Sequence, residues 1–145
     1  MWGKAVKTLN ILILEDHLET RELHKRIFAD HIVHEADTFA DGIQKATELH
    51  PNIILTDLRL IDSLEHETAS KISLLRHASP LASILVVSGF INEDLAKVAL
   101  HAGADMVLEK DELLTSRLLA AIEASNEPAP IAKALDLAKK TQRLG

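Results

Sequence analysis

Four short apolar runs, each followed by a polar residue, dominate the hydrophobic pattern of this chain. They are Ile-Leu-Ile-Leu before Glu15-Asp16, Ile-Ile-Leu-Thr before Asp57, Ile-Leu-Val-Val before Ser88, and Met-Val-Leu-Glu before Lys110. Runs of this length that are rich in Ile and Val are typical of strands buried on both faces of a parallel sheet. We therefore expect four central or near-central strands, each ending in a polar side chain.

The segments between these runs have apolar residues at the 3.6-residue spacing of amphipathic helices. In the first segment, Leu23, Ile27 and Phe28 share one side, which we expect to face the core. The sequence predicts helices over 17–30, 38–50, 67–77, 92–102 and 111–124, and a further short strand over 32–36.

The predicted helices also have recognisable ends. Thr38 and Asn92 are suitable N-caps, because their side-chain oxygens can accept from free backbone N–H groups of the first turn. Gly103 stands where a helix C-cap requires positive φ. These signals support the boundaries of the second and fourth helices.

Strand and helix alternate five times in this scheme, which predicts a parallel sheet with right-handed crossovers and helices on both faces. Five units are too few for a closed eight-stranded barrel. We expect an α/β, flavodoxin-like doubly wound sheet of five parallel strands in the order 2-1-3-4-5. Its switch point lies between the first and third strands, where Asp16 and Asp57 end their runs.

The predicted domain does not fill the chain. We divide it into an N-terminal extension (1–8), the α/β domain (9–124), a linker with two prolines (125–130) and a C-terminal helical tail (131–145). Apolar residues of the tail form one stripe opposite a basic side. We expect this helix to pack on its own domain, and docking on a partner or on a second copy stays open.

Composition narrows the functional classes. The 145 residues have a formal net charge of −6 and no cysteine, which excludes disulfides, zinc–thiolate sites and cysteine nucleophiles. The charge does not favour nucleic acid as a partner of this chain, and no apolar stretch approaches membrane-spanning length. We expect a cytoplasmic protein, and we expect its eight histidines to lie at the surface without a metal-binding role.

In parallel sheets, ligands bind beyond the carboxyl ends of the strands. The residues Glu15, Asp16, Asp57, Ser88 and Lys110 should therefore meet at one edge: three carboxylates, a hydroxyl and an ammonium group. Oxygen ligands at this density suit Mg²⁺, with Asp16 and Asp57 as direct ligands and Glu15 acting through water. Asp57 is then the candidate nucleophile towards phosphorus, and Ser88 and Lys110 would stabilise the phosphoryl oxygens.

As a set, Glu15-Asp16, Asp57, Ser88-Gly89 and Lys110 resemble the acidic pair, phosphoacceptor, switch hydroxyl and lysine of the response-regulator receiver domain of two-component signalling. The resemblance covers roughly residues 9–124. It implies that a sensor histidine kinase, a phosphotransfer protein or a small phosphodonor supplies a phosphoryl group to Asp57, with Mg²⁺ as the cofactor.

The same resemblance implies further roles. The backbone carbonyl of Arg59 would complete the protein ligands of Mg²⁺, and Gly89 would leave room for the phosphoryl group. Arg59 and Phe90 occupy positions that tune the phosphoryl lifetime in family members. A bulky Phe90 could slow the entry of water, and it could equally be a contact residue for a partner.

Two departures from the family pattern concern the output. Val107 stands where most receivers have a Tyr or Phe that moves inward with the hydroxyl residue, so the usual aromatic readout is missing. Asp111 follows Lys110 where many receivers have proline, and we expect a trans peptide bond there. This variant and the Glu15-Asp16-His17 sequence resemble receivers that precede helix-turn-helix DNA-binding domains.

We expect a receiver that signals by protein contact with a downstream target, with a homodimer as a further form of assembly. It would not be an enzyme, apart from phosphotransfer and dephosphorylation on itself. Two alternatives stay open: a phosphorylation-independent binding module, and the isolated receiver part of a longer DNA-binding regulator. A metal-dependent phosphatase is disfavoured, because Arg59 stands where those enzymes have their general acid.

Overall fold

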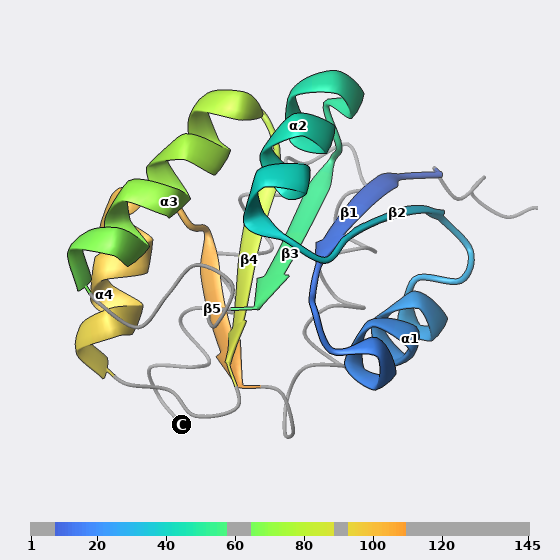
Figure 1. Cartoon of the computed structure of the whole chain (residues 1–145), viewed down its shortest axis with the longest axis horizontal. Coiled ribbons are helices and arrows are strands. Elements are labelled where there is room, and N and C mark those ends of the chain that lie inside the picture. The colour runs from blue at the N-terminus through green and yellow to red at the C-terminus, as the bar shows by residue number, and fades with distance from the viewer. Residues whose placement is uncertain (1–7, 58–64, 89–92, 110–145) are drawn as a thin grey trace, which may run out of the picture.

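The computed structural model describes residues 8–57, 65–88 and 93–109. Its strands form one parallel sheet in the order β2-β1-β3-β4-β5 (Figure 1), which confirms the predicted order. The elements are β1 (Asn10–Leu14), α1 (Leu18–Ile27), β2 (Ile32–Ala36), α2 (Phe39–Leu49), β3 (Ile53–Asp57), α3 (Glu65–Ala78), β4 (Ser83–Ser88), α4 (Glu93–Ala102) and β5 (Met106–Glu109).

Some predictions fall outside the described residues. They are the helix over 111–124, the linker over 125–130, the tail over 131–145, the N-cap at Asn92 and the trans peptide after Lys110. Among the described helices, none is both long enough and apolar enough to cross a bilayer.

Strands β1, β3 and β4 are buried on both faces, and alternate residues of these strands serve different cores, whereas the edge strand β2 is only partly buried. Ile11 and Ile13 of β1 belong to a core cluster that also contains Phe28, at the end of α1. Leu12 and Leu14 belong to a second cluster, which α2, α3 and α4 cover through side chains such as Ala46. Figure 1 shows α1 on one side of the sheet and the other three described helices on the opposite side, as the predicted doubly wound fold requires.

The predicted caps of α2 and α4 are confirmed at the positions that the structure describes. Thr38 Oγ1 accepts a hydrogen bond from the Asp41 amide at 3.1 Å, and Gly103 has φ of 129°. Gly42 of α2 serves a different purpose, since a Cβ at this position would lie 2.3 Å from Leu14 Cδ2. The missing side chain lets α2 approach β1 closely, directly before Glu15.

The predicted phase of α1 is wrong in two respects. Leu23 is 49% exposed, whereas His24 is 2% exposed. The buried stripe of the helix runs through His24 and, four residues later, Phe28, which turns Leu23 towards solvent. The expectation that every histidine lies at the surface is therefore wrong for His24.

Arg76, near the end of α3, ties together the loops at the amino end of the sheet. Its guanidinium donates to the backbone oxygens of Gly103 and Ala82 at 2.8 and 2.6 Å, and to Asp105 Oδ2 at 2.8 Å. Asp105 in turn accepts from the Ile84 amide at 2.8 Å. One side chain thus satisfies acceptors from both loops that precede β4 and β5.

We predict that Arg76→Met lowers the free energy of unfolding by about 2 kcal/mol, because several part-buried acceptors lose their donor together. The measurement is urea unfolding followed by circular dichroism. Lys97→Met is the matched control, since the Lys97–Glu93 pair is exposed on both sides and should contribute less than about 0.5 kcal/mol. Equal stability of Arg76→Met and the wild type would contradict the assigned role.

Candidate functional site

The register of the parallel sheet brings the acidic residues together. Leu14 of β1 pairs with Thr56 of β3, so Glu15 and Asp57 are the next residues along two neighbouring strands. Asp57 itself pairs with Val87 of β4. The carboxyl end of β3 therefore lies between the carboxyl ends of β1 and β4, as the sequence predicted.

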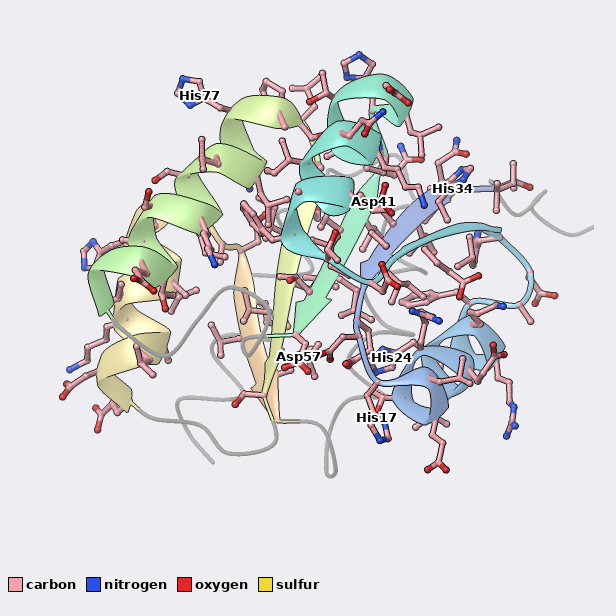
Figure 2. All side chains as sticks on the ribbon, in the orientation of Figure 1. His17, His24, His34, Asp41, Asp57 and His77 are labelled. Carbon is pink, nitrogen blue, oxygen red and sulfur yellow. The ribbon has the colours of Figure 1, made fainter. Side chains whose placement is uncertain are left out.

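Glu15, Asp16 and Asp57 form an acidic cluster at this edge, with one carboxylate oxygen of each residue within 4.8 Å of the others. Glu15 is 1% exposed and Asp57 is 2% exposed, whereas Asp16 is exposed. Figure 2 shows Asp57 at the end of β3, on the side of the molecule where His17 precedes α1. Two buried acids and one accessible acid thus share a small volume.

The donor set fits a hard divalent cation. Three carboxylates at this separation repel one another, and a bound cation would relieve the repulsion. All candidate ligand atoms are oxygens, which Mg²⁺ and Ca²⁺ prefer. The exposed side chain of Asp16 leaves the cluster accessible from solvent.

The turn between β1 and α1, residues 15–17, is fixed by local hydrogen bonds. The Glu15 amide donates to Ala36 O of β2 at 2.9 Å. The His17 amide donates to Glu15 Oε2 at 3.1 Å. His17 is the N-cap of α1, and its Nδ1 accepts from the Thr20 amide at 3.4 Å. The helix therefore begins at Leu18, one residue later than predicted, because His17 caps it from outside.

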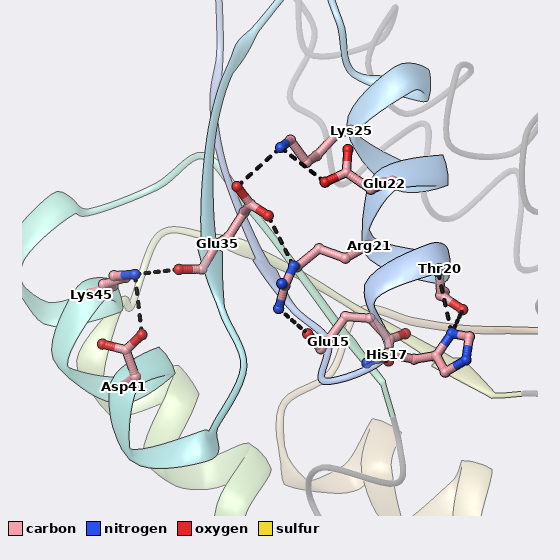
Figure 3. A network of polar contacts seen from close by, with 9 residues as sticks. All are labelled: Glu15, His17, Thr20, Arg21, Glu22, Lys25, Glu35, Asp41 and Lys45. Atoms are coloured by element: carbon pink, nitrogen blue, oxygen red, sulfur yellow. Dashed lines mark hydrogen bonds and ion pairs between the residues drawn. The ribbon is translucent and has the colours of Figure 1, made fainter.

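Residues beyond this turn extend the polar network to the edge strand (Figure 3). Arg21 of α1 donates through Nη1 to Glu15 O at 3.0 Å and pairs through Nε with Glu35 Oε1 at 2.9 Å. Lys25 Nζ lies 3.2 Å from the other oxygen of the same carboxylate. The hydrogen bond to Glu35 raises the pKa of Lys25. Lys45 of α2 donates to the backbone oxygen of Glu35.

Sequence reasoning did not identify Arg21 or Glu35. A helical side chain leans towards the amino end of its helix, so an arginine one turn after an N-cap can reach back to the preceding strand. That signal is present in the sequence at Arg21. Its partner Glu35 could not be inferred from spacing, since it lies on a separate strand.

Ser88 and Val107 lie where predicted, at the carboxyl end of β4 and inside β5. Ser88 is 7% exposed, and Val107 is 4% exposed within the core cluster that faces α4. The predicted site residues Arg59, Gly89, Phe90 and Lys110 lie outside the described residues. The structure thus brings together the three acids and places Ser88 on the strand next to Asp57.

Solved structures of other proteins share this fold. A receiver domain protein (CheY-like) from Methanospirillum hungatei JF-1 is 24% identical, with a TM-score of 0.70 over 93% of this chain and 99% of that chain. The signal receiver domain of the putative response regulator NarL from Mycobacterium tuberculosis is 21% identical, with a TM-score of 0.67 over 81% of this chain and 98% of that chain.

A third similar structure is a response regulator protein from Burkholderia pseudomallei with a phosphorylated aspartic acid, calcium ion and citrate. It is 23% identical, with a TM-score of 0.68 over 92% of this chain and 74% of that chain. At these identities the similarity establishes the fold. A comparison with curated protein sequences found no match.

The family comparison is more specific than the structural one. The model of the response regulator receiver domain matches residues 11–123, which is most of the chain and includes the acidic cluster. Together with the strand order and the position of Asp57, this match settles the family. The chain belongs to the response regulator receiver domain family.

Proposed function

We propose that this receiver accepts a phosphoryl group on Asp57 from a sensor histidine kinase or a phosphotransfer protein, with Mg²⁺ as the cofactor. The observation that carries the proposal is the position of Asp57, which is 2% exposed beside Glu15 and the accessible Asp16 at the carboxyl edge of the sheet. The family match supports the same role for this residue.

In the proposed reaction, a carboxylate oxygen of Asp57 attacks phosphorus and forms an acyl phosphate. The bond between phosphorus and the donor's histidine nitrogen breaks, and that nitrogen keeps the electron pair. Mg²⁺, held by Asp16 and Asp57, with Glu15 acting through water and the Arg59 carbonyl as a further ligand, would supply positive charge to the phosphoryl oxygens. Ser88, Gly89 and Lys110 would contact those oxygens from the other side.

We further propose that the phosphorylated protein acts in the cytoplasm by contact with a downstream protein, without contact with DNA through this chain. Its chemistry would be limited to phosphotransfer onto itself and hydrolysis of its own acyl phosphate. The absence of a side-chain carboxylic acid at Arg59 supports this limit, because a phosphatase of the aspartate-nucleophile type needs a general acid there.

A second candidate is a binding module whose contacts do not depend on phosphorylation. Val107 favours it, because this buried β-branched side chain stands at the position of the mobile aromatic of other receivers. Valine has one strongly restricted χ1 angle and offers no large ring to relocate. The two candidates differ in how far from Asp57 the structure should change when this residue is phosphorylated.

Incubation with acetyl phosphate and Mg²⁺ should add one phosphoryl group to the wild type and none to Asp57→Asn, because the amide nitrogen and oxygen of Asn are poor nucleophiles. Intact-mass spectrometry in acid detects the adduct, and base should release it. Asp30→Asn, at an exposed acid beyond the far end of α1, is the control and should be labelled like the wild type. Labelling of Asp57→Asn would contradict the proposal.

The acidic cluster should also make stability depend on Mg²⁺. In chelator, Asp16→Asn should unfold with a free energy up to about 1 kcal/mol higher than the wild type, since one repelling charge is removed. With saturating Mg²⁺ the order should reverse, because ligand binding stabilises the wild type. Urea unfolding measures both values. Asp30→Asn should follow the wild type in both buffers, and an unchanged order would argue against a cation at Asp16.

Beryllofluoride with Mg²⁺, a stable mimic of a phosphoryl group, separates the two candidates. The leading proposal predicts changes in the amide chemical shifts at Asp57, at Ser88 and along α4. Two-dimensional ¹H–¹⁵N spectra record them, with Asp57→Asn as the unresponsive control. Changes confined to Glu15, Asp16 and Asp57 would favour the second candidate.

A further inference from the structure

Both backbone groups of Glu15 are connected to the edge strand β2, the amide directly and the carbonyl through Arg21 of α1. The amide donates directly to Ala36 O at 2.9 Å. The carbonyl accepts from Arg21 Nη1 at 3.0 Å, and Arg21 in turn pairs with Glu35, the residue before Ala36. Neighbouring residues of one strand thus fix the turn that carries Glu15 and Asp16, one directly and one through Arg21.

The contacts of Arg21 need a planar guanidinium. Its Nη1 donates to Glu15 O after β1 at 3.0 Å, and its Nε lies 2.9 Å from Glu35 Oε1 of β2, as an ion pair without hydrogen-bond geometry. A guanidinium presents separate nitrogens to these two partners, whereas a lysine ammonium on a flexible stem is a single point charge. The Arg21 side chain is 18% exposed, so little room is left for other rotamers.

Glu35 is itself held from both neighbouring helices. Lys25 of α1 lies 3.2 Å from its second carboxylate oxygen, and Lys45 of α2 donates to its backbone oxygen. Lys45 also pairs with Asp41 of α2 at 3.1 Å. Figure 3 shows this arrangement, in which Glu35 lies between the two helices and Arg21 links it to the turn. The Lys45 contact holds the backbone of the strand itself, whereas the Lys25 pair, with both side chains 35% exposed, contributes little.

We propose that Arg21 is a positioning residue of the acidic cluster, and that the Arg21–Glu35 pair holds Glu15 and Asp16 in the arrangement that binds a divalent cation. The inference rests on the proposed function, since it concerns the same cation site. It adds two residues that would act through the turn instead of binding the cation or the phosphoryl group themselves, and it makes the edge strand β2 part of the site's support.

The charge of Arg21 and its proposed positioning role predict opposite effects of its removal on the affinity for the cation. Arg21 is a cation in contact with the turn that carries Glu15 and Asp16, so its removal should strengthen cation binding if only Coulomb interactions matter. If Arg21 positions the turn, its removal should weaken cation binding, as loss of the groups that orient metal ligands typically does by about 10-fold or more. The sign of the change therefore separates the two roles.

The test compares Mg²⁺ binding to the wild type, Arg21→Met and Lys25→Met by isothermal titration calorimetry. Methionine keeps the apolar stem and removes the donors. Lys25→Met is the matched control, because Lys25 pairs with the same Glu35 carboxylate and with Glu22 of its own helix. We expect about 10-fold weaker binding for Arg21→Met and a change of less than about twofold for Lys25→Met.

A second measurement needs no cation. In chelator, the amides of Glu15 and His17, whose hydrogen bonds fix the turn, should exchange with deuterium faster in Arg21→Met than in Lys25→Met. Arg21→Lys, which keeps the charge and loses the fork, should also bind Mg²⁺ more weakly than the wild type. It keeps the test decisive if Arg21→Met folds poorly.

Unchanged or tighter Mg²⁺ binding in Arg21→Met and Arg21→Lys would overturn the inference and leave the proposed function intact. Absence of phosphoryl labelling in a wild type that binds Mg²⁺ would overturn the proposed function, while the positioning role would still be judged by affinity and exchange. Absence of Mg²⁺ binding in the wild type would overturn both.

Discussion

The site depends on the register between β1 and β3. Because Leu14 lies beside Thr56 in a buried parallel ladder, the next residues, Glu15 and Asp57, must be neighbours. A shift by one residue would move every side chain of the strand to the opposite face and disrupt both core clusters. The apolar runs therefore hold carboxylates together against their repulsion, and burial on two faces supplies the free energy that makes this possible.

Charged side chains are arranged differently at the two ends of the parallel strands. At the amino edge, Arg76 and Asp105 neutralise each other and satisfy the loop backbone. At the carboxyl edge, the described residues place oxygens of three acids within 4.8 Å of one another, and Arg21 binds the backbone carbonyl of Glu15 and the carboxylate of Glu35. The neutral pair at the amino edge favours stability, whereas the clustered carboxylates at the carboxyl edge are suited to a divalent cation.

The correct predictions came from two patterns, the periodicity of hydrophobic residues and the polar residues at the ends of the strands. The fold class, the strand order and the convergence of Glu15, Asp16 and Asp57 follow from apolar runs with polar ends, and the structure confirms them. The predicted buried face of α1 was wrong because Leu23 and His24 are adjacent, and hydrophobicity alone favoured Leu23 as the buried residue. The Arg21–Glu35 pair joins a helix to an edge strand, so it could not be predicted from the spacing of residues within one element. Sequence patterns thus encode faces and edges better than pairings between long charged side chains.

In the proposed function, the phosphorylation chemistry and its readout would depend on different residues, and Val107 concerns only the readout. Its side chain packs in the core cluster of the face that α4 covers, together with Val86 and Ala99. Ser88 follows Val86 by two residues on β4, so the hydroxyl belongs to the same face of the strand. A displacement of Ser88 would therefore press on this close-packed cluster, and valine can respond only by moving with its backbone. Transmission to α4 would require a shift of β4 or β5 as a unit, instead of the rotation of one aromatic ring.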